Sequence, residues 1–358
     1  MTKRITDTRF NRACRGEEVD CVPVWMMRQA GRYMPEYRAI RAPHTFLEFC
    51  RNPDLCARAT LEAAKYLDTD AAIIFSDITI PAWGMGLNLD FSPGPRFDPP
   101  VRTMKEIDAL TEIDPAKDLP FVFEAIAKTR AGLPDHVSLI GFVGAPLTLA
   151  AYMIEGYPDK NWVHFKSMMY DAPEQLDALL DKVATAVTAH ARAQVEAGCD
   201  VIQVFDTNAG LLPPDCLEKF AFKYAEKVIR GVQELGVPVI YFAKGISQHL
   251  DKAAKMKSDV LGVDWTISLK DAREKVGPGI TLQGNLDPCA LFASAPEVRK
   301  RVTAILEDMK GDAGFIMNLG HGILPKTPPE NAREIVRTVR DFYGQAWNGV
   351  DLEMDPES

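Results

Sequence analysis

The 358-residue sequence lacks the residue spacings of the common metal, redox and nucleotide-binding sites. Its seven cysteines form no CxxC pair, and there is no HExxH motif, EF-hand loop or P-loop. No GxGxxG follows the first apolar run, so the usual fingerprint of a dinucleotide-binding sheet is missing. We therefore expect no metal and no cofactor, and we interpret the cysteines as reduced thiols of a cytoplasmic protein.

The sequence also lacks an excess of positive charge and a visible targeting segment. Its formal net charge is −9, which argues against nucleic acid or an anionic membrane as a general partner. Residues 1–16 are charged throughout, so we expect no signal peptide. The stretch 137–154 is uncharged, but its glycines and Pro146 indicate a buried strand, a turn and the start of a helix rather than a membrane span.

The chain does contain a repeated alternation of short apolar runs and amphipathic segments. Eight runs are nearly continuous in apolar residues, which is typical of strands covered on both faces. Eight strands alternating with helices predict an α/β fold, a single-domain (β/α)8 TIM barrel over residues 1–350, with a disordered acidic tail at 351–358. An open doubly wound sheet is the alternative. The predicted strands are 22–28, 71–77, 137–143, 200–206, 237–243, 259–264, 280–285 and 314–320.

The segments between these strands differ in character. Residues 84–103 are rich in glycine and proline, so we expect them to form an excursion above the barrel. Residues 155–164 are predicted to form a lid-like loop. The amphipathic segments predicted to be helices include 172–197, 214–235, 295–309 and 328–345.

Arg28 and Arg32 form the most informative local pattern. They lie in Met-Arg-Gln-Ala-Gly-Arg-Tyr, which follows the first predicted strand and contains Gly31. An arginine matches a carboxylate with two parallel hydrogen bonds, and a glycine lets the backbone approach a ligand closely. On an acidic chain the pair predicts a pocket for a small, highly anionic molecule. The alternative is that both are surface arginines paired with Glu36 or other acids.

Polar side chains also follow the other predicted strands, at the end of the barrel where active sites of this fold lie. Asp77 ends an apolar strand, and its carboxylate either stabilises positive charge on a ligand or has a structural role, capping the next helix or pairing with an arginine. Lys244 either forms a Schiff base, as in class I aldolases, or pairs with an acid. His321 and Tyr152 are each either ligand contacts or structural residues. The predicted ring consists of Arg28, Arg32, Asp77, Tyr152, Asp206, Thr207, Lys244, Asp264, Asn285 and His321.

Several motifs resemble those of the uroporphyrinogen decarboxylase family and occur in the family's order along the chain. Residues 27–38 resemble its N-terminal signature, and residues 141–156 (Gly-Phe-Val-Gly-Ala-Pro-Leu-Thr-Leu-Ala-Ala-Tyr-Met-Ile-Glu-Gly) resemble its second one. The resemblance runs from about residue 5 to 345. It implies a cofactor-free, homodimeric TIM barrel that removes the four acetate carboxyl groups of uroporphyrinogen III, giving coproporphyrinogen III and carbon dioxide in haem biosynthesis. Shorter matches lie at 74–77, 241–245, 262–265, 283–288 and 318–322.

The resemblance also implies roles for individual residues. Asp77 is implied to be the catalytic residue, which accepts hydrogen bonds from pyrrole N–H groups and stabilises the cation formed when a pyrrole carbon is protonated. Arg28 and Arg32 are implied to anchor substrate carboxylates. The proton donor stays open among Arg28, a substrate carboxyl group and water. The other implied substrate contacts are the backbone of Gln29, Ala30 and Gly31 and the side chains of Arg41, Tyr152, Thr207 and His321.

Three other functions are kept as alternatives. Related barrels include corrinoid-dependent methyltransferases that hold zinc with histidine and cysteine, but here the last strand ends in Gly-His-Gly without cysteine. A tetrapyrrole-binding protein without catalysis would keep the same pocket. A class I aldolase would use Lys244.

Overall fold

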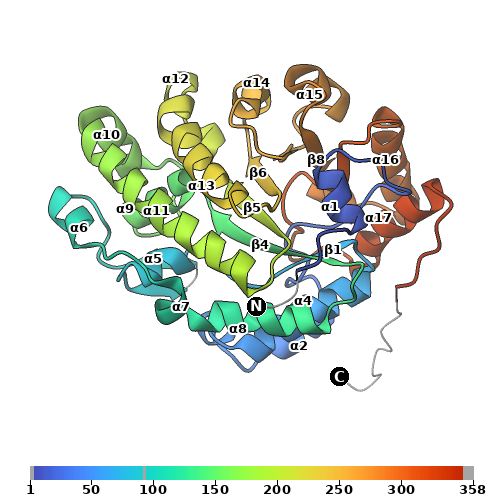
Figure 1. Ribbon diagram of the computed structural model, residues 1–358, viewed down its shortest axis with the longest axis horizontal. Helices are drawn as coiled ribbons and strands as arrows, with labels where there is room; N and C mark the ends of the chain where they lie inside the picture. The colour runs from blue at the N-terminus through green and yellow to red at the C-terminus, as the bar shows by residue number, and fades with distance from the viewer. Residues whose placement is uncertain (1–3, 92–93, 350–358) are drawn as a thin grey trace.

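The centre of the protein is a curled parallel sheet surrounded by helices, as a computed structural model of residues 4–91 and 94–349 shows (Figure 1). Its seven hydrogen-bonded strands follow the order β1-β4-β5-β6-β7-β8-β9, so neighbours in sequence are neighbours in space. The predicted acidic tail at 351–358 lies outside the described residues. The strands are β1 (Ala71–Ile73), β4 (Ser138–Gly144), β5 (Val201–Asp206), β6 (Val239–Ala243), β7 (Val260–Gly262), β8 (Thr281–Leu286) and β9 (Phe315–Leu319).

These strands confirm seven of the eight predicted positions and the α/β barrel arrangement, although β1 is shorter than expected. The pairing of β1 with β4 ends when Ile74 N donates to Ile140 O at 3.0 Å. The next backbone amide, that of Phe75, donates instead to the Thr60 hydroxyl at 2.9 Å. Because a side chain takes over that donor, Asp77 lies in a loop beyond the strand rather than at its last residue.

The predicted first strand, 22–28, is wrong as a regular strand, since its only sheet pairing is an isolated parallel bridge between Val24 and Met317 of β9. On its other side Asp70 replaces a ladder through both its side chain and its backbone: Val24 N donates to Asp70 Oδ2 at 2.8 Å, and Asp70 N donates to Val24 O at 2.9 Å. Arg9 and Arg340 neutralise this buried carboxylate at 2.7 and 2.9 Å. The eighth position of the barrel is therefore occupied by a short irregular segment.

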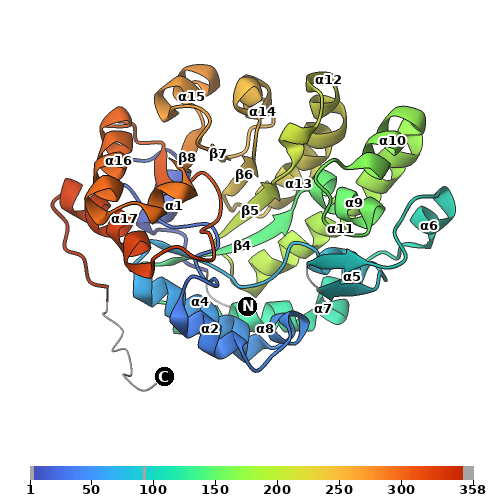
Figure 2. The ribbon, with the colours of Figure 1, turned by 180° about the vertical axis from the view of Figure 1, so that it is seen from behind.

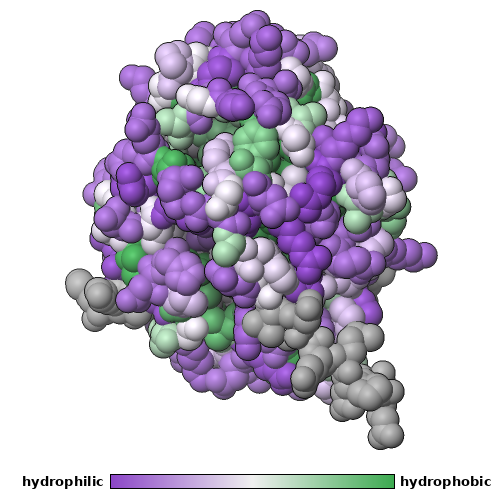
Figure 3. Space-filling view, turned by 90° about the vertical axis from the view of Figure 1, so that its right-hand side faces the viewer, coloured by the Kyte–Doolittle hydropathy of each residue, from purple (hydrophilic) through white to green (hydrophobic). Residues whose placement is uncertain are grey.

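The helices lie on the outside of the curled sheet, as the opposite view confirms (Figure 2). Many begin with proline in the first turn, where its missing N–H costs no helical hydrogen bond. The face of the molecule that Figure 3 shows is mostly hydrophilic, with scattered hydrophobic patches. The predicted helices at 172–197, 295–309 and 328–345 are confirmed. Segment 214–235 is interrupted by a π-helical turn at Leu217–Phe222. The helices are α1 (Arg9–Cys14), α2 (Pro35–Arg41), α3 (Phe46–Cys50), α4 (Pro53–Leu67), α5 (Ile80–Gly84), α6 (Met104–Ala109), α7 (Pro115–Asp118), α8 (Pro120–Gly132), α9 (Pro146–Glu155), α10 (Val163–Asp171), α11 (Pro173–Ala197), α12 (Pro214–Cys216), α13 (Lys223–Gln233), α14 (Leu250–Ala254), α15 (Leu269–Val276), α16 (Ala295–Asp308) and α17 (Pro329–Phe342).

Alternate strand residues enter two separate apolar clusters. Along β6, Ile240 and Phe242 belong to a small cluster inside the barrel, while Tyr241 packs in the larger cluster between sheet and helices. This period of two is that of a strand buried on both faces. Helix α1 contributes Phe10 and Cys14 to the inner cluster, so apolar packing fills the barrel interior below its C-terminal end.

The excursion predicted at 84–103 contains a small antiparallel hairpin. It pairs β2 (Leu89–Phe91) with β3 (Pro95–Phe97), and Phe97 N donates to Gly156 O at 2.8 Å. This bond attaches the hairpin to the loop between α9 and α10, the segment predicted to be lid-like. The uncharged stretch 137–154 forms β4, a turn and most of α9, as predicted. Within the described part of the chain, no helix is long and apolar enough to cross a membrane.

Candidate active site

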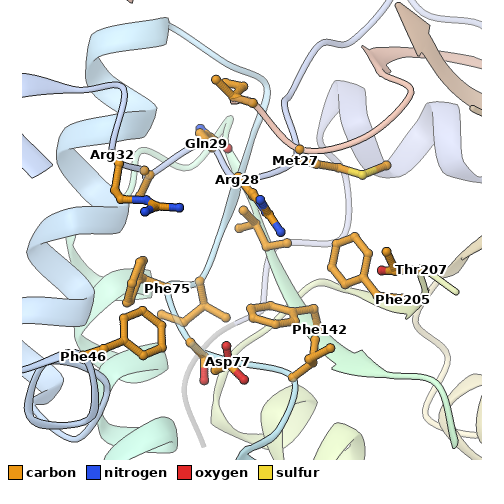
Figure 4. A pocket seen from close by; sticks show the side chains of 18 of the residues that line it. Met27, Arg28, Gln29, Arg32, Phe46, Phe75, Asp77, Phe142, Phe205 and Thr207 are labelled. Atoms are coloured by element: carbon orange, nitrogen blue, oxygen red, sulfur yellow. The ribbon is translucent and has the colours of Figure 1, made fainter. Parts of the chain in front are cut away.

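A cavity of about 600 Å³ opens at the C-terminal ends of the strands. The motif after the first predicted strand forms one wall, and the segments following β1, β4, β5, β6 and β9 form the others. Every residue predicted to contact substrate lines this one cavity: Arg28, Gln29, Ala30, Gly31, Arg32, Arg41, Asp77, Tyr152, Thr207 and His321. Figure 4 shows Arg28 and Arg32 on one side and Asp77 across the cavity from them.

Arg28 is held in place by backbone conformation and packing. It adopts a left-handed backbone, with φ of +60°, which is uncommon for a residue with a side chain. Its side chain lies across Gly322, where a Cβ atom would come within 2.4 Å of Arg28 Cδ. A Cβ at Gly31 would come within 3.1 Å of Arg28 O. Gly31 and Gly322 therefore allow close packing around Arg28. The left-handed backbone conformation is that of Arg28 itself.

The cavity arginines lack acidic partners. Among residues 4–91 and 94–349, no carboxylate lies within ion-pair distance of Arg28, Arg32 or Arg41. The alternative in which Glu36 neutralises the pair is therefore wrong. Arg41, the last residue of α2, packs its guanidinium 5.8 Å from the Phe46 ring centroid. These guanidinium groups give the cavity local positive charge on a chain of net charge −9.

Gln29 lines the cavity, and both its side chain and its carbonyl are hydrogen-bonded within the protein. Its side chain is buried and donates from Nε2 to the Thr69 hydroxyl at 2.7 Å. Its carbonyl accepts a hydrogen bond from the Tyr33 hydroxyl at 2.8 Å. The turn is also held by Arg38, whose Nη1 donates to Arg32 O at 2.9 Å. These contacts fix the loop that presents the two cavity arginines.

Asp77 divides its two carboxylate oxygens between structure and cavity. Oδ1 accepts hydrogen bonds from Thr79 N at 2.8 Å and Thr79 Oγ1 at 2.5 Å. No described residue donates to Oδ2. Burial raises the pKa of Asp77, and the Thr79 bonds and the charge of Arg28 oppose this effect. Oδ1 thus closes a local turn, while the role of Asp77 toward a ligand stays a prediction.

Two side chains with hydroxyl groups, Tyr152 and Thr207, also line the cavity. Tyr152 comes from α9, and its pKa is raised by burial and by the negative charge of Asp77. Its hydroxyl is therefore a protonated donor near neutral pH. Thr207 directly follows β5, which places its side chain at the end of that strand. Figure 4 shows Thr207 beside Phe205.

His321 follows β9, and the pKa of its ring is lowered to about 4, mainly by burial and also by the positive charges of Arg28 and Lys244. The ring is then neutral at pH 7, so it contributes hydrogen bonding rather than charge. It also lies 6.1 Å from the Phe242 ring centroid.

The His321 titration provides a pH-dependent prediction. NMR titration of the ring protons should give a midpoint near pH 4, and His321→Asn should remove that signal. Because the folded pKa lies below the unfolded value of about 6.5, the unfolded state binds more protons between these values. His321 therefore lowers the free energy of unfolding as the pH drops from 6.5 to 4. The His321→Asn variant should lose less stability than the wild type over this range. A midpoint near 6.5 would contradict this prediction.

Three polar residues of the predicted ring are hydrogen-bonded within the protein and do not line the cavity. Asp206 is buried and accepts from Thr148 Oγ1 at 2.7 Å and from the Tyr241 hydroxyl at 2.9 Å. Burial raises its pKa to about 6. Asp264 and Asn285 are occupied by neighbouring backbone and side-chain groups. The position at a strand end could not distinguish these residues from those that line the cavity, since their hydrogen-bonding partners come from other segments of the chain.

Lys244 does not have the surroundings that a Schiff-base lysine needs. Its side chain is exposed, it does not line the cavity, and its Nζ lies 5.6 Å from the Trp265 ring centroid. A nucleophilic lysine is activated by desolvation or by a neighbouring cation. The exposed position therefore argues against the aldolase alternative.

Sequence reasoning missed the aromatic walls of the cavity. Phe46 and Phe91 lie 4.6 Å apart between ring centroids, and Phe142 and Phe205 lie 5.7 Å apart. Their strands and loops looked like ordinary core segments, so only the tertiary structure shows that these rings face a cavity. The phenylalanines that line it are Phe46, Phe75, Phe91, Phe142, Phe205 and Phe242.

The described residues contain no group of three or more histidine, cysteine, aspartate or glutamate side chains placed to hold a metal ion. All seven cysteines are free, and six of them are buried. The cavity is lined by arginines, one carboxylate, hydroxyl groups, the His321 imidazole and phenylalanine rings.

Comparison with known proteins gives consistent results. The family described as "Uroporphyrinogen decarboxylase (URO-D)" matches residues 6–342. The chain is 48% identical over 333 residues to a uroporphyrinogen decarboxylase of Geobacter metallireducens, covering 93% of this chain and 98% of that protein. It is 47% identical over 334 residues to the protein of that name from Pelobacter propionicus, again covering 93% and 98%.

Two solved structures share the fold. A methyltransferase from Methanosarcina mazei has a TM-score of 0.81 at 24% identity, covering 95% of this chain and 100% of that one. A B12-independent methionine synthase from Shewanella sp. W3-18-1 has a TM-score of 0.57 at 14% identity, covering 82% and 87%. At these identities the likeness concerns the fold alone.

Proposed function

The chain belongs to the uroporphyrinogen decarboxylase family, and from this we propose that it removes the four acetate carboxyl groups of uroporphyrinogen III, giving coproporphyrinogen III and carbon dioxide. It is thus a carboxy-lyase of porphyrin and haem biosynthesis. The observation that carries the proposal is one cavity that combines unpaired arginines, a carboxylate with a free oxygen and aromatic walls.

The cavity is suited to an anionic tetrapyrrole. Its phenylalanine rings can pack against pyrrole rings, and the guanidinium groups of Arg28, Arg32 and Arg41 can bind peripheral carboxylates. The Oδ2 atom of Asp77 is an acceptor for pyrrole N–H groups, which supply the donors that a half-buried carboxylate needs. Tyr152, Thr207 and the neutral His321 complete the proposed substrate contacts, together with the backbone of Gln29, Ala30 and Gly31.

The chemistry needs an electron sink and a stabilised positive charge. Protonation of the pyrrole carbon next to the one that bears the acetate arm makes the ring cationic and leaves the substituted carbon conjugated to the ring C=N bond. The electron pair of the breaking carbon–carbon bond then flows into the ring, and carbon dioxide leaves. A second proton adds to the exocyclic carbon and the ring proton departs, so each decarboxylation consumes one proton in total. The carboxylate of Asp77 stabilises the cation, and because the ring accepts the electron pair, the proposal includes no cofactor.

Turnover under defined conditions tests this function. Metal-stripped protein is incubated anaerobically with uroporphyrinogen III, and the products are oxidised and separated by carboxyl number. A ladder from eight to four carboxyl groups is expected. An unchanged eight-carboxyl peak with folded protein would contradict the proposal and favour a non-catalytic binding protein.

Arg32→Lys tests the proposed carboxylate site. Lysine keeps the charge but loses the planar fork, so KM should rise roughly 10-fold while kcat changes little. Arg58→Lys, at an exposed ion pair with Glu62 on α4, is the matched control and should leave both constants unchanged. Unchanged KM in Arg32→Lys would place the carboxylate contact elsewhere.

We also propose that the protein is a homodimer. Three large apolar side chains, Leu211, Trp265 and Phe292, are at least 38% exposed in loops that follow β5, β7 and β8. Such side chains at one end of the barrel support a protein interface. Sedimentation should give twice the monomer mass, and Trp265→Asp should shift it toward the monomer.

The remaining parts of the proposal concern domain organisation and location. We propose a single catalytic domain over residues 1–350, supported by the family match across 6–342. We propose a cytoplasmic location, supported by seven cysteines that form no disulfide.

A further inference from the structure

Thr79 stands at the start of α5, yet its hydroxyl does not cap that helix. Its backbone is in the α region, with φ of −85° and ψ of −8°, whereas an N-cap residue is typically extended. The hydroxyl instead donates to Asp77 Oδ1, and so does the Thr79 backbone N–H. Three threonines at the same position of other helices do accept a hydrogen bond from a first-turn backbone N–H: Thr8, Thr45 and Thr103.

Both donors of Thr79 hold the same carboxylate oxygen. Thr79 is fully buried, and it does not line the cavity, while Asp77 does. Two bonds to Oδ1 fix the rotation of the carboxylate about its last side-chain bond. Oδ2 is thereby directed to the cavity, where no described residue occupies it.

The same turn occurs a second time in the chain, with a different outcome. Thr266 donates to Asp264 Oδ1 from its backbone N at 2.9 Å and from its hydroxyl at 2.5 Å. There the second oxygen is closed, because Asp264 Oδ2 accepts from Gly245 N at 2.6 Å. At 264–266 the Asp-x-Thr turn has both carboxylate oxygens occupied. At 77–79 only Oδ1 of Asp77 is occupied by a described residue.

We propose that Thr79 is a positioning residue for Asp77: its hydroxyl fixes Oδ1 and thereby presents Oδ2 as the acceptor for substrate N–H groups. This inference rests on the proposed function, since it names the residue that orients the proposed catalytic carboxylate. Thr79 acts through Asp77 and does not touch substrate.

The hydroxyl also affects the charge of Asp77. The titratable groups whose charges interact with this carboxylate are Arg28, Tyr152 and Cys50. Burial raises the pKa of Asp77, and the Thr79 bonds and Arg28 lower it. Loss of the hydroxyl removes a bond to the ionised form, so a larger fraction of Asp77 is protonated at a given acidic pH.

A set of three variants tests the proposal. Thr79→Val keeps the shape but removes the hydroxyl, and kcat for uroporphyrinogen III should fall roughly 10- to 100-fold, as expected when a charged group loses a hydrogen bond. The acidic limb of its pH–rate profile should also move to higher pH. Thr79→Ser keeps the hydroxyl and should restore kcat to within about 3-fold, with a wild-type pH profile. Thr266→Val removes the hydroxyl of the second turn and should keep kcat and the pH profile.

The outcomes separate this inference from the proposed function. If wild-type protein turns over and Thr79→Val matches it in kcat and pH profile, the positioning role is wrong while the function stands. Equal losses in Thr79→Val and Thr79→Ser, or an equal loss in Thr266→Val, would indicate a purely structural role and also overturn the inference. Absence of turnover in the wild type would remove the proposed function itself.

Discussion

Replacing Asp77 with asparagine should lower kcat about 10²- to 10³-fold, the usual effect of losing one charge-stabilising contact to a reacting group. The amide can still accept the two Thr79 bonds through its oxygen. Its NH2 group would then face the cavity. As a hydrogen-bond donor it cannot accept from pyrrole N–H groups, and as a neutral group it cannot balance the charge of a protonated ring. The loss should appear in kcat rather than in KM, because the charge develops only during the reaction.

The Asp77→Asn variant should fold and should be at least as stable as the wild type. Burial raises the pKa of Asp77, which means that the folded state disfavours its ionised form relative to water. A neutral amide removes this penalty, so the thermal midpoint should stay the same or increase. Asp287→Asn is the matched control: Asp287 Oδ1 accepts from Cys289 N in a similar turn after β8, outside the cavity. Near-normal turnover in Asp77→Asn, or an equal loss in the control, would remove Asp77 from the central role.

The largest expected effect on stability comes from the opposite end of the barrel. Asp200 Oδ2 accepts from Arg130 Nη1 at 3.1 Å and from Leu139 N at 2.8 Å, and Oδ1 accepts from Ile5 N at 2.7 Å. Both charged side chains are nearly inaccessible, at 4% for Arg130 and 0% for Asp200. Asp200→Ala leaves a buried guanidinium without its counter-charge and should cost about 3–5 kcal/mol.

Urea denaturation followed by circular dichroism measures this cost. Asp181→Ala, which breaks the exposed pair with Lys227, is the control and should cost less than about 1 kcal/mol. Activity per folded molecule should stay normal in both variants, because neither carboxylate lines the cavity. Equal midpoints for the two variants would contradict the expected difference between buried and exposed pairs.

Seven strands could be predicted because each is a short apolar run, and the sheet buries both of their faces. The first predicted strand, 22–28, has the same apolar character, yet Asp70 supplies hydrogen bonds in place of a regular ladder. β1 also ends early, since the Thr60 hydroxyl takes the Phe75 amide. In both cases a polar side chain from a distant segment determined where regular strand pairing is absent or ends. No local sequence pattern indicates such a partner.

The same distinction holds for the site. The motif around Arg28 and Arg32 predicted that these arginines line a cavity, which the structure shows, because arginines next to a glycine turn are a local feature. Asp206 and Asp77 looked alike in sequence, as aspartates at the ends of apolar runs. They differ because Thr148 and Tyr241 occupy both oxygens of Asp206, whereas Thr79 occupies one oxygen of Asp77.

The sequence by itself determined the barrel class, the family resemblance and the motifs that carry Arg28, Arg32 and Asp77, since strand periodicity and contiguous motifs depend on neighbours along the chain. Only the tertiary structure decided which polar groups are free to meet a ligand. It showed that Arg28 and Arg32 have no acidic partner among the described residues, that Asp77 keeps one open oxygen and that phenylalanines wall the cavity. The physical reason is that hydrogen bonds and ion pairs at a barrel mouth join segments from different strands, so the availability of each group depends on contacts that sequence order does not encode.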